Sequence, residues 1–459
     1  MSADLLIHGG DIVTPTEIIR ADVAVSDGQI QAIGNREFMP PASNEIDATG
    51  KHVLPGIVDP HCHLGYVDTL ECAETETRAS ACGGVTCAGI YLLALKDGII
   101  AQFDRLHAEF EERSFIDAFF HLMVVDELTT REIAECPKIG INSFKFNMGY
   151  KGPHADLLGI SSTDDGATFR GFRTIAGMPA PARGAVHAEN IDIHLMLRDE
   201  LMAAGRSDYA VWNESRPPFV ESECMRRAIY LAKNAGCSLY FPHITIAEGV
   251  DIIAEARAQG LDVVGETCPQ YLTHSNEDPA AIFETHPACA NVNPPLRDRA
   301  CNDRLWEGIA QGVIHTVGSD LAPTTLEMKG DNIWEAPMGL ANNSELLLPV
   351  MLSEGVNKGR ISIEKLVEVC SYNPARTFGA FPRKGSLEVG ADADIVLVDL
   401  EARKTVSAEN LHTMCDWSIY DGWELTGWPT HTILRGEVIV ENGEPKPRKA
   451  GQAQQVNTT

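Results

Sequence analysis

Apolar runs of strand length alternate with longer amphipathic stretches through the middle of this 459-residue chain. We expect strands near residues 52–58, 85–93, 116–125, 141–146, 184–188, 237–244, 261–267 and 313–320. Helix candidates lie at residues 99–113, 190–204, 221–235, 247–259 and 300–311. Eight such alternations predict a (β/α)8 barrel, a fold of the α/β class. A doubly wound sheet is the alternative, but it requires a glycine-rich phosphate turn where this chain has Pro60-His61-Cys62-His63.

The two ends of the chain have a different pattern. Short alternating strands that stop at Gly or Asp-Gly are predicted at residues 5–8, 22–25, 29–33, 393–400 and 432–440. Since both ends share this style, we expect one small β-sandwich built from both termini. The predicted organisation is a composite β-sandwich domain at 1–51 and 386–442, a catalytic barrel at 52–385, and a flexible or wrapping tail at 443–459.

Charge and composition exclude several classes of partner. The formal net charge of −28 argues against binding to nucleic acid or to an anionic membrane surface. No apolar run approaches the ~20 residues that a membrane span needs. The start of the chain has no basic segment followed by an apolar one, so we expect a cytoplasmic protein. The twelve cysteines include no C-x-x-C pair, which favours reduced thiols.

The first predicted barrel strand ends in two histidines, His61 and His63. Side chains alternate along a strand, so an H-x-H pair points two imidazoles to one side, roughly 6 to 7 Å apart along the backbone. Such a pair chelates a metal only if other residues join it. In a parallel barrel the reactive groups lie at the C-terminal ends of the strands, so the residues that end the other strands decide the question.

Polar side chains end four further predicted strands: Lys145, His187, His243 and Asp320. Each alone has an ordinary explanation, such as a helix cap, a histidine bonded to a carbonyl, or a lysine that reaches solvent. Together with the first histidine pair they would all meet at the same barrel mouth. Four imidazoles and a carboxylate suit Zn²⁺ or a similar borderline metal. A lysine ammonium cannot bind a cation, so Lys145 needs a further explanation.

Several segments also match a known family in order along the chain, at residues 56–63, 81–86, 143–150, 187–190, 265–272, 293–297, 318–320 and 390–396. With these motifs the chain resembles the cyclic amidohydrolases of the amidohydrolase superfamily, in particular the dihydropyrimidinase and hydantoinase group. The resemblance implies a metal-dependent hydrolase that opens the C–N bond of a small cyclic amide, of the hydantoin, dihydropyrimidine or cyclic imide type. It also implies a homotetramer, with a dimer as the alternative.

The resemblance further implies a role for each strand-end residue. His61, His63, Lys145 and Asp320 would hold the more buried of two divalent metal ions, and Lys145, His187 and His243 the more exposed one. Lys145 would be carbamylated by CO₂ so that it bridges both ions. The expected metal is Zn²⁺, with Mn²⁺ or Co²⁺ as alternatives. A bridging hydroxide would attack the amide, Asp320 would act as general base, and Tyr150 would donate a hydrogen bond to the oxyanion.

The substrate loops depart from the family pattern. Tyr150, Asn293, Leu321 and Met338 are the expected substrate-binding residues, and the last three differ from the residues usual in the family. An allantoinase, or a hydrolase of an unusual lactam or imide, is therefore the alternative. A non-catalytic dihydropyrimidinase-like assembly protein is a further one. Loss of metal ligands would be its signature, and here all six positions are filled.

Overall fold

Eight parallel strands form the centre of the protein. The computed structural model describes residues 2–65, 69–94, 97–151, 155, 163–340 and 343–447. The sheet runs in chain order through β8 (Ile57–Cys62), β9 (Val85–Leu92), β10 (Asp117–Val124), β11 (Ser143–Asn147), β12 (Arg183–His187), β13 (Leu239–Phe241), β14 (Val263–Thr267) and β15 (Thr316–Val317). A parallel bridge between Cys62 and Leu321 joins the two edges, and the backbone N–H of His63 donates to the Leu321 carbonyl at 2.7 Å. The predicted (β/α)8 barrel is confirmed.

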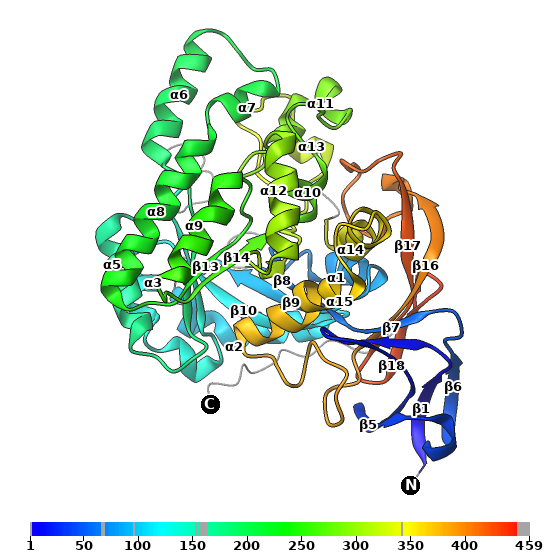
Figure 1. Cartoon of the computed structure of the whole chain (residues 1–459). Helices are drawn as coiled ribbons and strands as arrows, with labels where there is room; N and C mark the ends of the chain where they lie inside the picture. Colours follow the sequence, from blue (N-terminus) through cyan, green and yellow to red (C-terminus); the bar gives the residue numbers. More distant parts are fainter. Residues whose placement is uncertain are drawn as a thin grey trace.

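Helices surround this barrel (Figure 1). The five predicted helices correspond to α2 (Gly98–Arg113), α6 (Ile191–Ala203), α8 (Pro218–Ala235), α9 (Ala247–Ala258) and α12 (Arg299–Ala310). Others include α1 (Ala73–Cys82), α3 (Glu127–Glu132), α5 (Asp165–Ala176), α7 (Ala210–Glu214), α10 (Pro269–Thr273), α11 (Ile282–Thr285), α13 (Leu326–Lys329), α14 (Asn343–Val350), α15 (Ile363–Val367) and α16 (Asn373–Phe378). No helix in the described ranges is long and apolar enough to cross a membrane.

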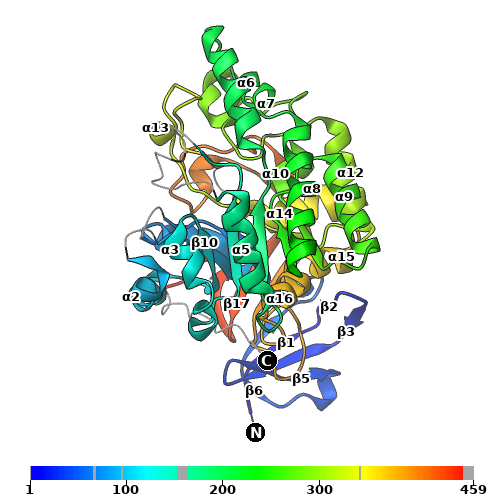
Figure 2. The ribbon, with the colours of Figure 1, turned by 90° about the vertical axis from the view of Figure 1, so that its left-hand side faces the viewer.

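Two further sheets lie beside and below the barrel (Figure 1 and Figure 2). A four-stranded sheet has the order β5 (Gln29–Gly34), β4 (Asp22–Ser26), β1 (Ala3–His8), β6 (Ala42–Asp47). A seven-stranded sheet has the order β19 (Glu444–Pro445), β18 (Glu437–Glu441), β17 (Glu424–Leu434), β16 (Ile395–Thr405), β7 (His52–Pro55), β2 (Asp11–Val13), β3 (Ile18–Arg20). One hydrophobic core contains residues of both sheets, including Leu5, Val23, Val53 and Ile395. Both ends of the chain therefore build one β unit, as predicted.

The boundary between the two units lies within the run expected as one strand at 52–58. β7 pairs antiparallel with β16 in the seven-stranded sheet, whereas β8 begins the barrel. Gly56 lies between the two strands. No side chain fits at this position, because a Cβ would lie 2.1 Å from Oγ1 of Thr86. The predicted tail at 443–459 begins with β19, and residues 448–459 lie outside the described residues. We keep the two-domain division as a proposal, with β7 assigned to the terminal domain.

A buried ionic cluster connects the barrel to the terminal domain. Lys384 Nζ lies 2.6 Å from Oδ2 of Asp117, at the start of β10, and 2.7 Å from Oδ2 of Asp394, just before β16. Arg435, which follows β17, also pairs with Asp117. Lys384 and the two aspartates are almost fully buried. The cluster lies at the N-terminal end of β10, opposite the strand ends that carry the predicted metal ligands.

Candidate metal centre

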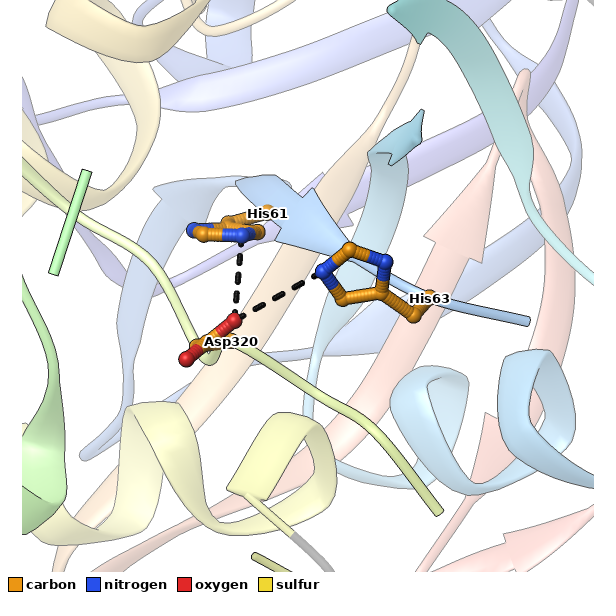
Figure 3. A group of neighbouring side chains, drawn as sticks. All are labelled: His61, His63 and Asp320. Atoms are coloured by element: carbon orange, nitrogen blue, oxygen red, sulfur yellow. Dashed lines mark ion pairs between the residues drawn. The ribbon is translucent and has the colours of Figure 1, made fainter. Parts of the chain in front are cut away.

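The ends of β8 and β15 bring three of the predicted ligands together (Figure 3). Nε2 of His61 lies 3.0 Å and Nε2 of His63 lies 3.8 Å from the same oxygen, Oδ1 of Asp320. Lys145 comes from β11, and its Nζ lies 2.9 Å from Nε2 of His61. Four side chains from three parts of the sequence thus face a common point at the barrel mouth.

His187 and His243 form a second group beside the first. Nδ1 of His187 lies 3.1 Å from Nε2 of His243. The ring centroids of His61 and His243 are 5.4 Å apart. All six residues predicted from the strand ends therefore lie at one mouth of the barrel.

Two of these residues have an unusual backbone conformation. His243 has a φ of 43° and Asp320 a φ of 52°, both in the left-handed region that non-glycine residues seldom occupy. The backbone N–H of His243 donates to Oε1 of Glu266 at 3.0 Å, which helps to hold this conformation. Strained backbone of this kind persists where the surroundings fix it, and it is common at functional sites. Here it occurs at residues just beyond β13 and β15, at the barrel mouth.

Buried carboxylates set the tautomers of two of the imidazoles. Oε1 of Glu266 lies 2.8 Å from Nδ1 of His61, and Oε2 of Glu189 lies 2.7 Å from Nε2 of His187. Because an ionised carboxylate only accepts hydrogen bonds, these ring nitrogens carry the protons. The opposite nitrogen of His187 then presents a lone pair to the centre, whereas Nε2 of His61 faces Oδ1 of Asp320 at 3.0 Å and would give up its proton when a metal binds. A carboxylate behind the ring is the usual arrangement of a histidine that binds a metal.

The electrostatics of the centre also fit a divalent cation. Burial lowers the pKa of His63 and of His243 well below the ordinary value, so both are neutral, the form that coordinates metal. Burial likewise lowers the pKa of Lys145, which favours the neutral amine. Burial alone would raise the pKa of Asp320, but the charge on His61 and its hydrogen bond hold it well below its usual range. Burial would lower the pKa of His61, but the carboxylates of Asp320 and Glu266 raise it. The two neutral imidazoles of His63 and His243 beside an ionised carboxylate are suitable ligands for Zn²⁺.

A cavity of about 130 Å³ opens onto this group. His63, Lys145, His243 and Asp320 line it, and Tyr150, Asn293 and Met338 are also part of its wall. The Tyr150 ring lies 4.9 Å from the His187 ring, and burial raises the pKa of its phenol, which therefore stays protonated. Leu321 is not among the described residues that line the cavity. It is buried, and its backbone helps to close the barrel.

Sequence reasoning did not single out Glu189, Glu266 or Tyr91. The Tyr91 ring is close to the centre, with Nζ of Lys145 4.4 Å from its centroid and the His63 ring stacked on it at 5.4 Å. Glu266 is completely buried within the otherwise uncharged strand Val263–Thr267. A carboxylate inside such a strand was the available signal, since a buried charge requires partners.

A second group of potential metal ligands lies elsewhere, formed by Cys82, Glu345 and His412. Oε1 of Glu345 accepts from Nδ1 of His412 at 2.7 Å, and Oε2 accepts from the backbone N–H of the same residue at 2.8 Å. Both carboxylate oxygens are thus engaged in holding one loop. We interpret this group as a loop anchor.

The sequence comparisons agree with this geometry. Residues 289–439 match the model of the amidohydrolase family. A D-hydantoinase of Geobacillus stearothermophilus is 36% identical over 455 residues, which cover 95% of this chain and 93% of the relative. The chain belongs to the amidohydrolase family. An allantoinase of Deinococcus radiodurans is 34% identical to this amidohydrolase over 457 residues, with 97% of each chain covered.

Solved structures show the same likeness to this amidohydrolase. The crystal structure of dihydropyrimidinase from Brevibacillus agri NCHU1002 superimposes with a TM-score of 0.90 at 33% identity, covering 99% of this chain and 98% of the other. The resemblance inferred from the sequence motifs is therefore confirmed. Membership of the family implies a divalent metal site, and the cluster of His61, His63 and Asp320 supplies a matching ligand set.

Proposed function

We propose that this amidohydrolase opens a cyclic amide by hydrolysis of its C–N bond at a centre of two divalent cations. The observation that carries the proposal is the convergence of four imidazoles, one carboxylate and one buried lysine at a single barrel mouth. Zn²⁺ is the expected metal, because nitrogen ligands dominate the set. Mn²⁺ and Co²⁺ are the alternatives to test.

The six residues would divide between two cation positions. His61, His63 and Asp320 form the first, and His187 and His243 form the second. Lys145, whose Nζ contacts Nε2 of His61, would serve both after reaction of its neutral amine with CO₂. Formation of the carbamate releases a proton and replaces the neutral amine with an anionic group, so the lysine becomes a ligand.

Two such cations, when bound, acidify a shared water and polarise a carbonyl. Asp320 would take the proton released on attack and return it to the departing amide nitrogen, which a carboxylate can do with its second oxygen. Tyr150 lines the cavity beside His187 and stays protonated, so it would donate to the oxyanion of the tetrahedral intermediate.

The substrate class follows from the cavity and the relatives. The wall includes apolar side chains such as Leu93, Met123 and Val292, together with the Asn293 and Met338 loops. A small flat ring of the hydantoin, dihydropyrimidine or cyclic imide type is our first candidate. Allantoin is the second, because the Deinococcus radiodurans relative is named an allantoinase.

One experiment tests both the centre and the substrate. The protein is produced with Zn²⁺, Mn²⁺ or Co²⁺ and bicarbonate, and its metal content is measured on the same sample as its turnover of hydantoin, dihydrouracil, allantoin and succinimide. We expect two metal ions per chain and ring opening of at least one compound. A metal-free protein that turns over none of the four would contradict the proposal. A homotetramer in light scattering would agree with the family resemblance, and a dimer is the alternative.

A further inference from the structure

The two halves of the centre have different charges behind their histidines. We call His61, His63 and Asp320 the inner half, and His187 and His243 the outer half. These names follow the two cation positions that the family resemblance implies, since the side chains of His63 and Asp320 are themselves more exposed than those of His187 and His243. Glu266 lies behind the inner half and Glu189 behind the outer half, and both carboxylates are completely buried. The partners of these two carboxylates differ, and that difference carries the inference.

Glu266 is held by an imidazole, a backbone amide and a hydroxyl in the part of the chain that the structure describes. Its Oε1 accepts from Nδ1 of His61 at 2.8 Å and from the backbone N–H of His243 at 3.0 Å. Its Oε2 accepts from the Tyr240 hydroxyl at 2.5 Å. Glu266 forms no ion pair with a described lysine or arginine, so its full negative charge acts on the His61 imidazole.

Glu189 forms an ion pair with an arginine. Its Oε2 accepts from Nε2 of His187 at 2.7 Å and from Nη1 of Arg216 at 3.0 Å. Arg216 is itself buried and packs against the Trp212 ring. The pair of Glu189 and Arg216 is therefore neutral as a unit.

We propose that the inner half retains its cation more strongly than the outer half, and that Glu266 and Arg216 set this difference. Asp320 and Glu266 give the inner half two negative charges, whereas Glu189 and Arg216 cancel behind the outer half. A carboxylate bonded to an imidazole makes the opposite nitrogen a stronger ligand, and an arginine that shares the carboxylate weakens this effect. Burial amplifies the contrast, because charges interact more strongly in a low dielectric. The inference rests on the proposed two-metal function.

The test is the release of metal from the loaded enzyme into an excess of a coloured chelator. We expect two phases, with the first ion leaving about ten-fold faster or more. His187→Asn should remove the fast phase and His63→Asn the slow one, which assigns each phase to a half. Release in a single phase, or with the order reversed, would overturn the inference. A protein that takes up no divalent cation would instead contradict the proposed function.

Two variants examine the cause of the difference. Glu266→Gln should speed the slow phase about 10- to 100-fold, since loss of such a partner typically costs that much in metal affinity. Arg216→Met should slow the fast phase, because Glu189 then acts on His187 with its full charge. General damage to the fold would speed release, so an unchanged or faster phase in Arg216→Met contradicts the assignment.

A matched control tests whether the loss of any buried carboxylate changes metal release. Glu76 is also a buried carboxylate without a lysine or arginine partner among the described residues, and it is held by the Thr413 hydroxyl and the backbone N–H of Met414. Glu76→Gln should leave both release phases within about two-fold of the parent protein, on the order expected for a site without contact to the ligands. If Arg216→Met does not fold, the comparison of Glu266→Gln with Glu76→Gln still decides, since equal effects of the two would refute the role of Glu266.

Discussion

Nζ of Lys145 lies 2.9 Å from Nε2 of His61, and both side chains are buried. Two groups that both bind protons are thus packed together without solvent to separate them. Burial lowers the pKa of this lysine, so the chain favours its neutral amine. The neutral amine is the form that would react with CO₂ in the proposed carbamate.

Lys145→Ala should lose both metal ions and all measurable ring opening, because both halves share this residue. Small carboxylic acids added to the variant should restore part of the metal content and activity, since a carboxylate can occupy the space of the carbamate. Metal analysis with and without the acid checks this. Lys145→Arg, which keeps the charge but forms no carbamate, should show no such rescue. A Lys145→Ala protein with two tightly bound ions would contradict the bridging role.

Tyr150→Phe should reduce kcat by the order of 10²-fold while KM and metal content stay nearly unchanged. The reason is that a donor to the oxyanion acts in the transition state and contributes little to binding of the ground state. Steady-state kinetics on the best substrate provide the measurement. Tyr230→Phe is the control, because Tyr230 is 69% exposed and should behave as the parent protein. A change in KM alone would argue that Tyr150 only shapes the cavity.

Burial of Lys329 should make the free energy of unfolding depend on pH. Its Nζ donates to the carbonyls of Asn291 and Pro337, at 3.0 and 2.8 Å, and burial lowers its pKa to about 7 from 10.5. Between these two values the unfolded chain binds a proton that the native chain lacks, so stability rises with pH. At about 1.4 kcal/mol per pKa unit the rise is at most about 5 kcal/mol.

Lys329→Met should therefore flatten the dependence of the free energy of unfolding on pH. Urea unfolding of parent and variant at several pH values between about 7 and about 10.5 gives the comparison. Only the difference between the two curves is assigned to Lys329, because other groups titrate in both proteins. Parallel curves would show that Lys329 keeps an ordinary pKa in the fold.

Lys384→Met should destabilise the protein by about 3–5 kcal/mol, because it leaves the carboxylates of Asp117 and Asp394 buried without their shared cation. The unfolding midpoint measures this. Lys138→Met is the control, since the ion pair of Lys138 with Glu135 is exposed and worth at most about 1 kcal/mol. Near-equal effects of the two would mean that the buried cluster adds little to stability. Metal content of the folded fraction should be the same in both.

The barrel, and the meeting of the residues proposed as metal ligands, could be predicted from the sequence for a physical reason. Parallel strands that alternate with helices place their C-terminal ends at one mouth, so a residue such as His243 is located by the strand it follows. The boundary at Gly56 was not accessible, because β7 and β8 form one continuous apolar run and only their partners, β16 and β9, distinguish them. Nor did any local pattern connect His61 with Glu266, which lies 205 residues further on.

Leu321 shows a further limit of motif reasoning. Its position beside Asp320 suggested a side chain in the substrate pocket, whereas in the structure the side chain is buried and the backbone bridges to Cys62. With Asp320 in a left-handed conformation, the chain turns between the two residues. A departure from the usual residue at this position therefore changes barrel packing more directly than the cavity wall.

The pairing of β7 with β16 has a consequence for synthesis of the chain. β7 leaves the ribosome early, but its partner is made only after the whole barrel has emerged. Until then β7 has an unpaired edge, which is a site for pairing with other chains. A chain that terminates before β16 should therefore aggregate, even though every predicted metal ligand is already present. Completion of the terminal sheet is the last step that protects the nascent protein.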